Sequence, residues 1–153
     1  MSQDRAQRPG ESGSALVEFI GAALLLLIPL MYLLLAVGRI QAAQFAVEAA
    51  ASSAVRAVVT APSSLEVEAW AYLAATVALA DQGFDIEDVL PGGGLRIECS
   101  ASPCLTPGAI VTASVRVSVP LPFIASLARN WLPLEVPVSA QARTHVDRYI
   151  EVR

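Results

Sequence analysis

The sequence predicts an α+β protein, in which a long N-terminal helix and a second helix pack on a small antiparallel β-sheet of about three strands. Three observations predict this fold. An uncharged apolar run of twenty residues separates Glu18 from Arg39, and neither Pro nor Gly follows Arg39 until Pro62. From about Leu95 onward, apolar residues recur at every second position, which is the periodicity of half-buried strands.

The apolar run predicts a membrane-spanning helix, since its twenty residues cover about 30 Å at the helical rise, one hydrocarbon thickness. Pro29 lies within the run and is expected to bend the helix. A cleaved secretory signal is the less favoured alternative, because its apolar region is usually about 7–15 residues long. A buried helix of a soluble core is less favoured again, because so short a chain has too little other apolar mass to surround the run.

The helix is expected to continue in water to about Thr60, because residues 39–61 are rich in Ala and have two distinct faces. Polar residues recur every three or four positions on one face: Gln41, Gln44, Glu48, Ser52 and Arg56. Small apolar residues form the opposite face: Ile40, Ala43, Val47, Ala50, Ala54 and Val58. Phe45 lies among the polar residues, where it either contacts a partner protein or, in the favoured interpretation, is covered by a loop of its own domain.

Pro62 ends the first helix. A second helix is expected to start in residues 63–66, because Ser63 and Glu66 have the spacing of a capping box. This second helix should stop near Gly83. An apolar stripe with i, i+4 spacing follows the start: Leu65, Ala69, Leu73, Val77 and Ala80, with Trp70 and Tyr72 beside it.

Three alternating runs predict the strands, at residues 95–99, 111–119 and 134–143. Between the second and third runs, residues 124–132 are expected to form a short helix. Pro137 faces away from the inward side chains of the third run, which favours an edge position for that strand. The inward side chains are Leu134, Val136, Val138, Ala140 and Ala142.

Cys99 and Cys104 are the only cysteines, and a loop of four residues containing a proline separates them. This arrangement favours a structural disulfide at the end of a hairpin. Two cysteines without a supporting His do not complete a zinc site. A disulfide places this part of the chain outside the cytoplasm, and Arg5 and Arg8 ahead of the apolar run favour a cytoplasmic N-terminus.

The sequence marks no catalytic or cofactor site. The net charge of −4 comes without a basic cluster, so nucleic acid is not an expected partner. His145 and Asp147 are expected to share a strand face but lack a third metal ligand, which favours a solvated position. Asp85, Glu87 and Asp88 lack the pattern of a calcium-binding loop and are interpreted as a charged loop. We therefore expect no enzyme, no cofactor and no metal.

Glu18 lies a few residues inside the apolar segment, where an unpaired carboxylate costs free energy; at headgroup depth it is simply solvated. The seven residues from Gly13 to Phe19 resemble the pilin-type N-terminus. There, a membrane peptidase cuts after a Gly and leaves a Glu at the fifth mature position. A cut between Gly13 and Ser14 places Glu18 fifth and Phe19 sixth, whereas a cut after Gly10 does not place a Glu fifth.

The wider stretch, Gly13 to Leu30 and Ala42 to Ala51, is similar to the TadE-like family of tight-adherence (Flp) pilus systems, in its actinobacterial form. The resemblance implies a small single-pass pseudopilin needed for assembly of the fibre. Its implied partners are the major pilin, other TadE/TadF-like proteins, the Tad platform proteins and the prepilin peptidase. Major pilins of this type are much shorter and have Tyr after the Glu, so Phe19 and the outer domain favour a minor or accessory subunit.

These interpretations divide the chain into a cytoplasmic leader (1–13), a transmembrane helix with an extracytoplasmic helical extension (14–61), and a small extracytoplasmic α+β domain (62–153). The expected location is the cytoplasmic (inner) membrane, crossed once. The leader is either removed, which makes Ser14 the new N-terminus, or kept as part of an uncut anchor. The alternative function is a membrane-anchored extracytoplasmic binding module that is not processed as a pilin.

Overall fold

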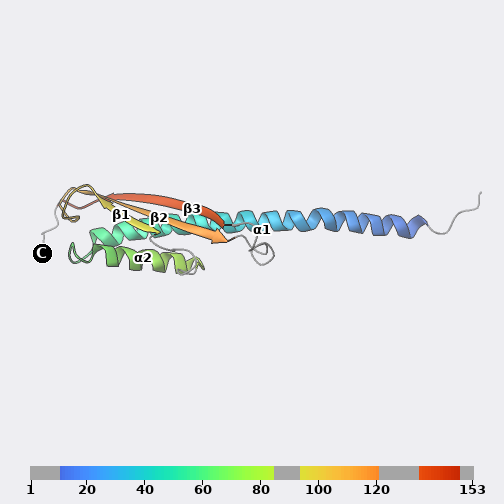
Figure 1. The fold of residues 1–153 in the computed structure, drawn as a ribbon, viewed down its shortest axis with the longest axis horizontal. Coiled ribbons are helices and arrows are strands. Elements are labelled where there is room, and N and C mark those ends of the chain that lie inside the picture. Colours follow the sequence, from blue (N-terminus) through green and yellow to red (C-terminus); the bar gives the residue numbers. More distant parts are fainter. Residues whose placement is uncertain (1–10, 85–93, 121–134, 149–153) are drawn as a thin grey trace, which may run out of the picture. The chain divides into compact units, whose positions relative to one another are not determined.

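The computed structural model describes residues 11–84, 94–120 and 135–148. It confirms the predicted α+β fold, with a long helix, a second helix and a three-stranded antiparallel sheet (Figure 1). The elements are α1 (Glu11–Val59), α2 (Val67–Asp81), β1 (Leu95–Cys99), β2 (Ile110–Pro120) and β3 (Glu135–His145). The chain forms two compact units, one up to Val37 and one from Gly38 onward. The second part of α1 therefore belongs to the same unit as α2 and the sheet.

The first unit contains the apolar part of α1. This helix begins at Glu11, three residues before the predicted start, and continues through Pro29. Among the described residues, α1 is the one helix that is long and apolar enough to cross a membrane. Its most apolar stretch has a mean hydropathy of 2.6. Only 6% of that window is buried within the protein, which is unlike the core helix of a soluble domain.

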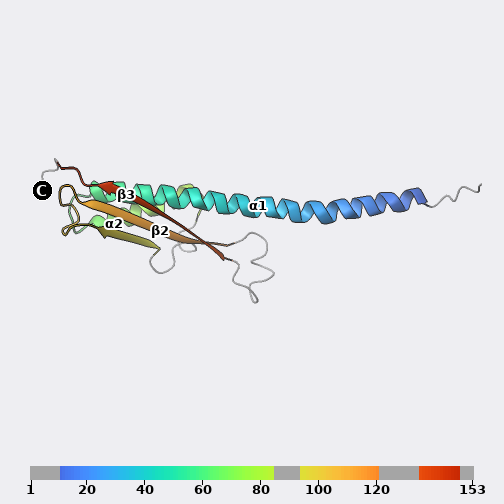
Figure 2. The ribbon, with the colours of Figure 1, turned by 90° about the horizontal axis from the view of Figure 1, so that it is seen from above.

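In the second unit, the sheet covers one side of α1, and α2 lies along another side of the same helix (Figure 1). The strands run obliquely across this part of α1 (Figure 2). The predicted packing face of α1 is confirmed, because Ile40 is half-buried and the other five side chains are buried: Ala43, Val47, Ala50, Ala54 and Val58. The predicted polar face is confirmed as well, with Ser52 half-buried and the rest exposed. The buried face of α1 therefore consists mainly of small side chains.

The sheet has the order β1-β2-β3, and both pairs are antiparallel. Alternate residues of the central strand β2 point into the core: Val111, Ala113, Val115, Val117 and Val119. The predicted edge position of the third strand is confirmed, because β3 pairs only with β2 among the described strands. Pro137 lies opposite Ser118 and is exposed, which agrees with its predicted outward direction.

The expected capping box of α2 is wrong. Glu66 is the N-cap residue, but no side chain caps the helix, and the backbone N–H of Glu66 donates to the carbonyl of Ser63 instead (3.2 Å). The apolar stripe of the sequence is exposed, whereas α2 buries Val67, Ala71, Ala75, Thr76 and Leu79. Both faces are apolar, so periodicity alone does not distinguish them. The predicted end is confirmed, since the helix stops at Asp81 and Gly83 has a φ of 73°.

Phe45 is 67% exposed on α1, so the interpretation that a loop of its own domain covers it is wrong. The expected helix at 124–132 and the acidic residues at 85, 87 and 88 lie outside the described residues. Leu134 also lies outside the described residues. The rest of the predicted inward face of β3 is confirmed, because Val138 is buried and three further side chains are half-buried: Val136, Ala140 and Ala142.

A disulfide joins Cys99, at the end of β1, to Cys104 in the loop that leads to β2, which is the pairing expected from the sequence. Their Cα atoms are 5.3 Å apart, within the usual range for this bond. The same loop is held by Ser100, whose N–H donates to the carbonyl of Ile110 (2.9 Å) and whose Oγ accepts from the N–H of Ile110 (2.8 Å). The covalent bond and these hydrogen bonds together define the turn between β1 and β2.

Replacing both cysteines by serine is expected to lower the free energy of unfolding by about 2 kcal/mol, because the closed loop is short and constrains the unfolded chain only modestly. Thermal unfolding of the full chain in detergent, with and without reductant, measures this change. The reductant should destabilise the wild type and leave the double variant unaffected. An equal response of both proteins would contradict the prediction.

Candidate functional site

The candidate processing and assembly residues lie together at the start of α1. Ser14, Glu18 and Phe19 are all exposed there. Ser14 and Glu18 are one helical turn apart and therefore share a face. Gly13 is the third residue of α1, in the first turn, where backbone N–H groups have no partner within the helix. Opening the helix at Gly13 therefore breaks few hydrogen bonds, which suits a peptidase cut at this position.

Glu18 differs from the other acidic residues of α1 in its surroundings. The neighbouring large side chains Leu16, Val17 and Phe19 are more than half exposed, so none of the described residues covers them. The next charge in the sequence is Arg39, beyond the twenty uncharged residues. In a bilayer, this carboxylate therefore stands at one end of an apolar helix with no basic side chain nearby on α1.

Arg39 follows the apolar run and lies at the start of the second compact unit, which begins at Gly38 and is called the outer unit below. Its guanidinium carbon lies 4.5 Å from the centroid of the Phe84 ring, the geometry of a cation–π contact. Phe84 is buried and follows directly after the turn that ends α2. This contact links Phe84, just after the end of α2, to α1 near the start of the outer unit.

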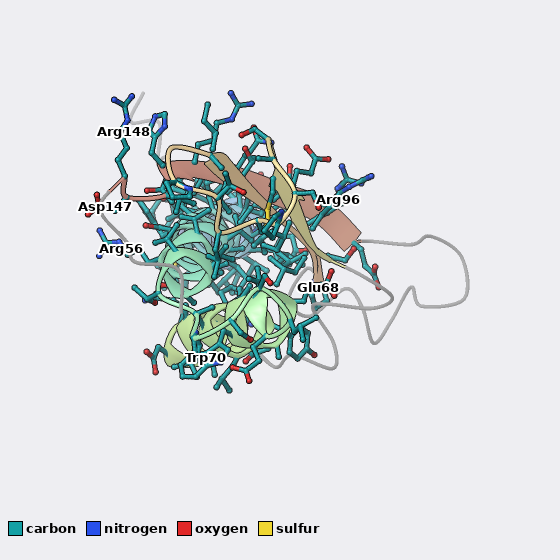
Figure 3. All side chains as sticks on the ribbon, turned by 90° about the vertical axis from the view of Figure 1, so that its left-hand side faces the viewer. Arg56, Glu68, Trp70, Arg96, Asp147 and Arg148 are labelled. Atoms are coloured by element: carbon teal, nitrogen blue, oxygen red, sulfur yellow. A yellow bond between two sulfur atoms is a disulfide. The ribbon has the colours of Figure 1, made fainter. Side chains whose placement is uncertain are left out.

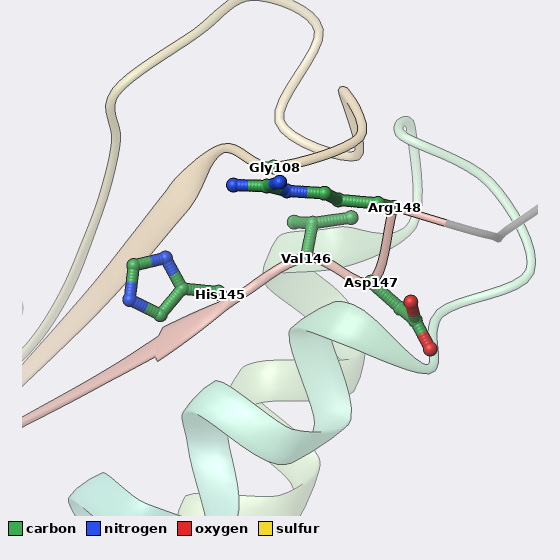
Figure 4. Close-up of a pocket in the computed structure, with 5 residues that line it drawn as sticks. All are labelled: Gly108, His145, Val146, Asp147 and Arg148. Atoms are coloured by element: carbon green, nitrogen blue, oxygen red, sulfur yellow. The ribbon is translucent and has the colours of Figure 1, made fainter.

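A pocket of about 480 Å³ lies at the end of β3, lined by Gly108, His145, Val146, Asp147 and Arg148 (Figure 4). The Arg148 side chain extends across Gly108, whose φ of 78° favours glycine. The expectation that His145 and Asp147 share a strand face is wrong, because β3 ends at His145 and the two side chains point apart. Among the described residues, no three His, Cys, Asp or Glu side chains are grouped to hold a metal ion.

A second pocket, of about 550 Å³, lies between α2 and β1 and is lined by Glu68, Ala69, Tyr72, Leu95, Arg96 and Ile97. The Arg96 Nε is 3.2 Å from the Glu98 Oε1, and both side chains are largely exposed. The described residues that line this pocket include no serine, cysteine or histidine; its polar side chains are Glu68, Tyr72 and Arg96. Sequence reasoning missed this pocket, because its lining depends on which face of α2 turns toward the sheet.

No family model, no curated protein and no solved structure matches the chain.

Proposed function

We propose that the protein is a minor pilin, or pseudopilin, or an accessory assembly factor of a Tad/Flp-type pilus system, held in the membrane by a single pilin-like helix. The observation that carries the proposal is the position of Glu18. This carboxylate is exposed, stands at the front of twenty uncharged residues, and is the fifth residue after the Gly13–Ser14 bond. The most apolar stretch of the helix that bears it is almost unburied, which suits insertion among other apolar helices.

The proposed orientation places the N-terminus in the cytoplasm and the outer unit on the opposite side of the membrane. Arg5 and Arg8 precede the apolar run and favour retention of that end in the cytoplasm. The Cys99–Cys104 disulfide supports an oxidising location for the outer unit. The partners under this proposal are the major pilin, other TadE/TadF-like proteins, the platform proteins and the prepilin peptidase.

The proposed mechanism of assembly follows from two charges. Cleavage after Gly13 creates an ammonium group on Ser14, one turn from Glu18 on the same helix face. In the low dielectric of the membrane each charge alone costs free energy. Pairing the ammonium of one subunit with the Glu18 carboxylate of a neighbour reduces the cost for both. Because the two groups occupy fixed positions on their helices, the pairing sets the axial register between subunits.

Deletion of the chain from its host tests the proposal. Surface fibres are expected to be lost while the major pilin still accumulates in the membrane, because an assembly subunit is missing and not the bulk subunit. The wild-type chain should restore the fibres, and a Gly13→Leu variant, which blocks the peptidase, should not. Gly10→Leu is the matched control in the same leader and should restore them. Unchanged fibres in the deletion strain would contradict the proposal.

A membrane-anchored binding module is the second candidate, and the exposed apolar side chains of α2 are the observation that favours it. In this case the leader stays in place and Gly13 has no role. Such a module predicts normal fibres after the deletion and an intact N-terminus.

A further inference from the structure

The outer face of α2, formed by Ala69, Trp70, Leu73, Val77 and Ala80, is apolar and uncovered. Trp70 is 45% exposed, Leu73 59% and Val77 53%. Figure 3 shows Trp70 on the side of α2 that is turned away from α1 and the sheet. The opposite face of the same helix is already buried in the core. A helix that is apolar on all sides is normally surrounded, so the outer face requires an occupant.

The charges around α2 restrict what that occupant is. From Arg56 to Arg96 the chain contains no basic residue, while six acidic residues lie between them: Glu66, Glu68, Asp81, Asp85, Glu87 and Asp88. Glu66, the N-cap residue of α2, lies one helical turn before Trp70, and Asp81 is the last residue of the helix; both are exposed, whereas Glu68 lines the pocket beside β1. The apolar face therefore has a negative charge at each end and no positive charge on the helix.

This charge pattern disfavours two occupants. An antiparallel pairing of α2 with α2 of a second copy places Glu66 against Asp81 at both ends, and like charges at an interface are costly. A parallel pairing brings identical carboxylates together. A lipid surface is disfavoured as well, because helices that lie on membranes carry Lys and Arg on their polar face and are attracted by anionic lipids.

We propose that the outer face of α2 is the docking site for an amphipathic helix of another protein, whose apolar stripe is flanked at both ends by Arg or Lys. Trp70, Leu73 and Val77 supply the apolar contact, with the indole as its largest anchor. Ala69 and Ala80 have small side chains, which leave room for side chains of the partner. Glu66 and Asp81 pair with the basic flanks and fix the position of the partner along α2. This inference stands on α2 alone and does not depend on Glu18 or on cleavage.

Site-specific photocrosslinking of the full chain in its native membranes tests the docking site. A photoreactive benzoylphenylalanine replaces Val77, and the same residue at Ile110, an exposed apolar position on β2, is the matched control. The expected result is an adduct at position 77 that peptide mass spectrometry maps to a basic-flanked apolar helix of another protein. The combined variant Glu66→Arg and Asp81→Arg should reduce the yield by about tenfold or more, because the partner's basic flanks then meet like charges.

Other outcomes overturn the inference. These are an adduct formed only with a second copy or with lipid, an adduct to a segment without basic flanks, equal yields at positions 77 and 110, or a yield unaffected by the charge reversal. The proposed function is tested separately by the deletion strain. An adduct with a protein unrelated to pilus assembly would leave the docking site in place and count against the proposed function, so the two failures are distinguishable.

Discussion

Replacement of Glu18 by alanine is expected to leave the protein inserted in the membrane but to lower its incorporation into assemblies by about two orders of magnitude or more. Under the proposed pairing, the variant leaves the Ser14 ammonium of the neighbouring subunit without its partner in a low-dielectric environment. Removing one member of a buried ion pair typically costs about 3–5 kcal/mol, and every 1.4 kcal/mol corresponds to about tenfold in an equilibrium. The apolar run itself is unchanged, so insertion is preserved.

Co-purification of the tagged protein with the major pilin, together with the count of surface fibres, measures this effect. Glu48→Ala is the matched control, because Glu48 is an exposed carboxylate on the same helix outside the apolar run. Its only described partner is Gln44, whose Nε2 donates to Glu48 Oε1 at 3.2 Å. The control should retain wild-type incorporation. Wild-type incorporation of the Glu18→Ala protein would exclude the proposed pairing.

Replacement of Ala50 by aspartate is expected to destabilise the outer unit by about 3–5 kcal/mol, the typical cost of an uncompensated buried charge. Ala50 is fully buried at the face of α1 that packs in the core with α2 and the sheet. No basic side chain is buried in the described part of the core, so the new carboxylate has no partner there. A loss of this size is a large fraction of the stability of a small domain.

Ala49→Asp is the matched control, because the preceding residue lies on the exposed side of the same helical turn. The two variants carry the same loss of helix propensity, and the control should change the free energy of unfolding by less than about 1 kcal/mol. Urea unfolding of the full chain in detergent measures both. Equal destabilisation of the two variants would contradict the packing of α1 described above.

Much of the outer unit follows from periodicity. Valine at every second position of β2 predicts a strand with one buried face, because successive side chains of a strand point to opposite sides. The two faces of α1 after Arg39 differ clearly in polarity, so the buried face is identifiable from the sequence. The disulfide was predictable because only one pairing of cysteines exists and the loop between them is short.

The arrangement of α2 was not predictable in the same way. Its i, i+4 stripe and its buried face are both apolar, and only the packing against α1 and β1 decides which one is covered. The pocket between α2 and β1 depends on that choice and could not be predicted either. The capping box failed because α2 begins at Val67, so that Glu66 and not Ser63 occupies the N-cap position and no side chain caps the helix. The role of Gly13 and Glu18 depends on other proteins, which a single chain does not contain.

The most direct test of the account is the intact mass of the protein recovered from membranes, with and without the prepilin peptidase. The account predicts a mature form that begins at Ser14 and that appears only when the peptidase is present. Processing at this bond would create the ammonium group that Glu18 is proposed to pair with. A protein that retains its leader in the presence of the peptidase would contradict pilin-type processing and favour a permanently anchored assembly factor or the anchored binding module.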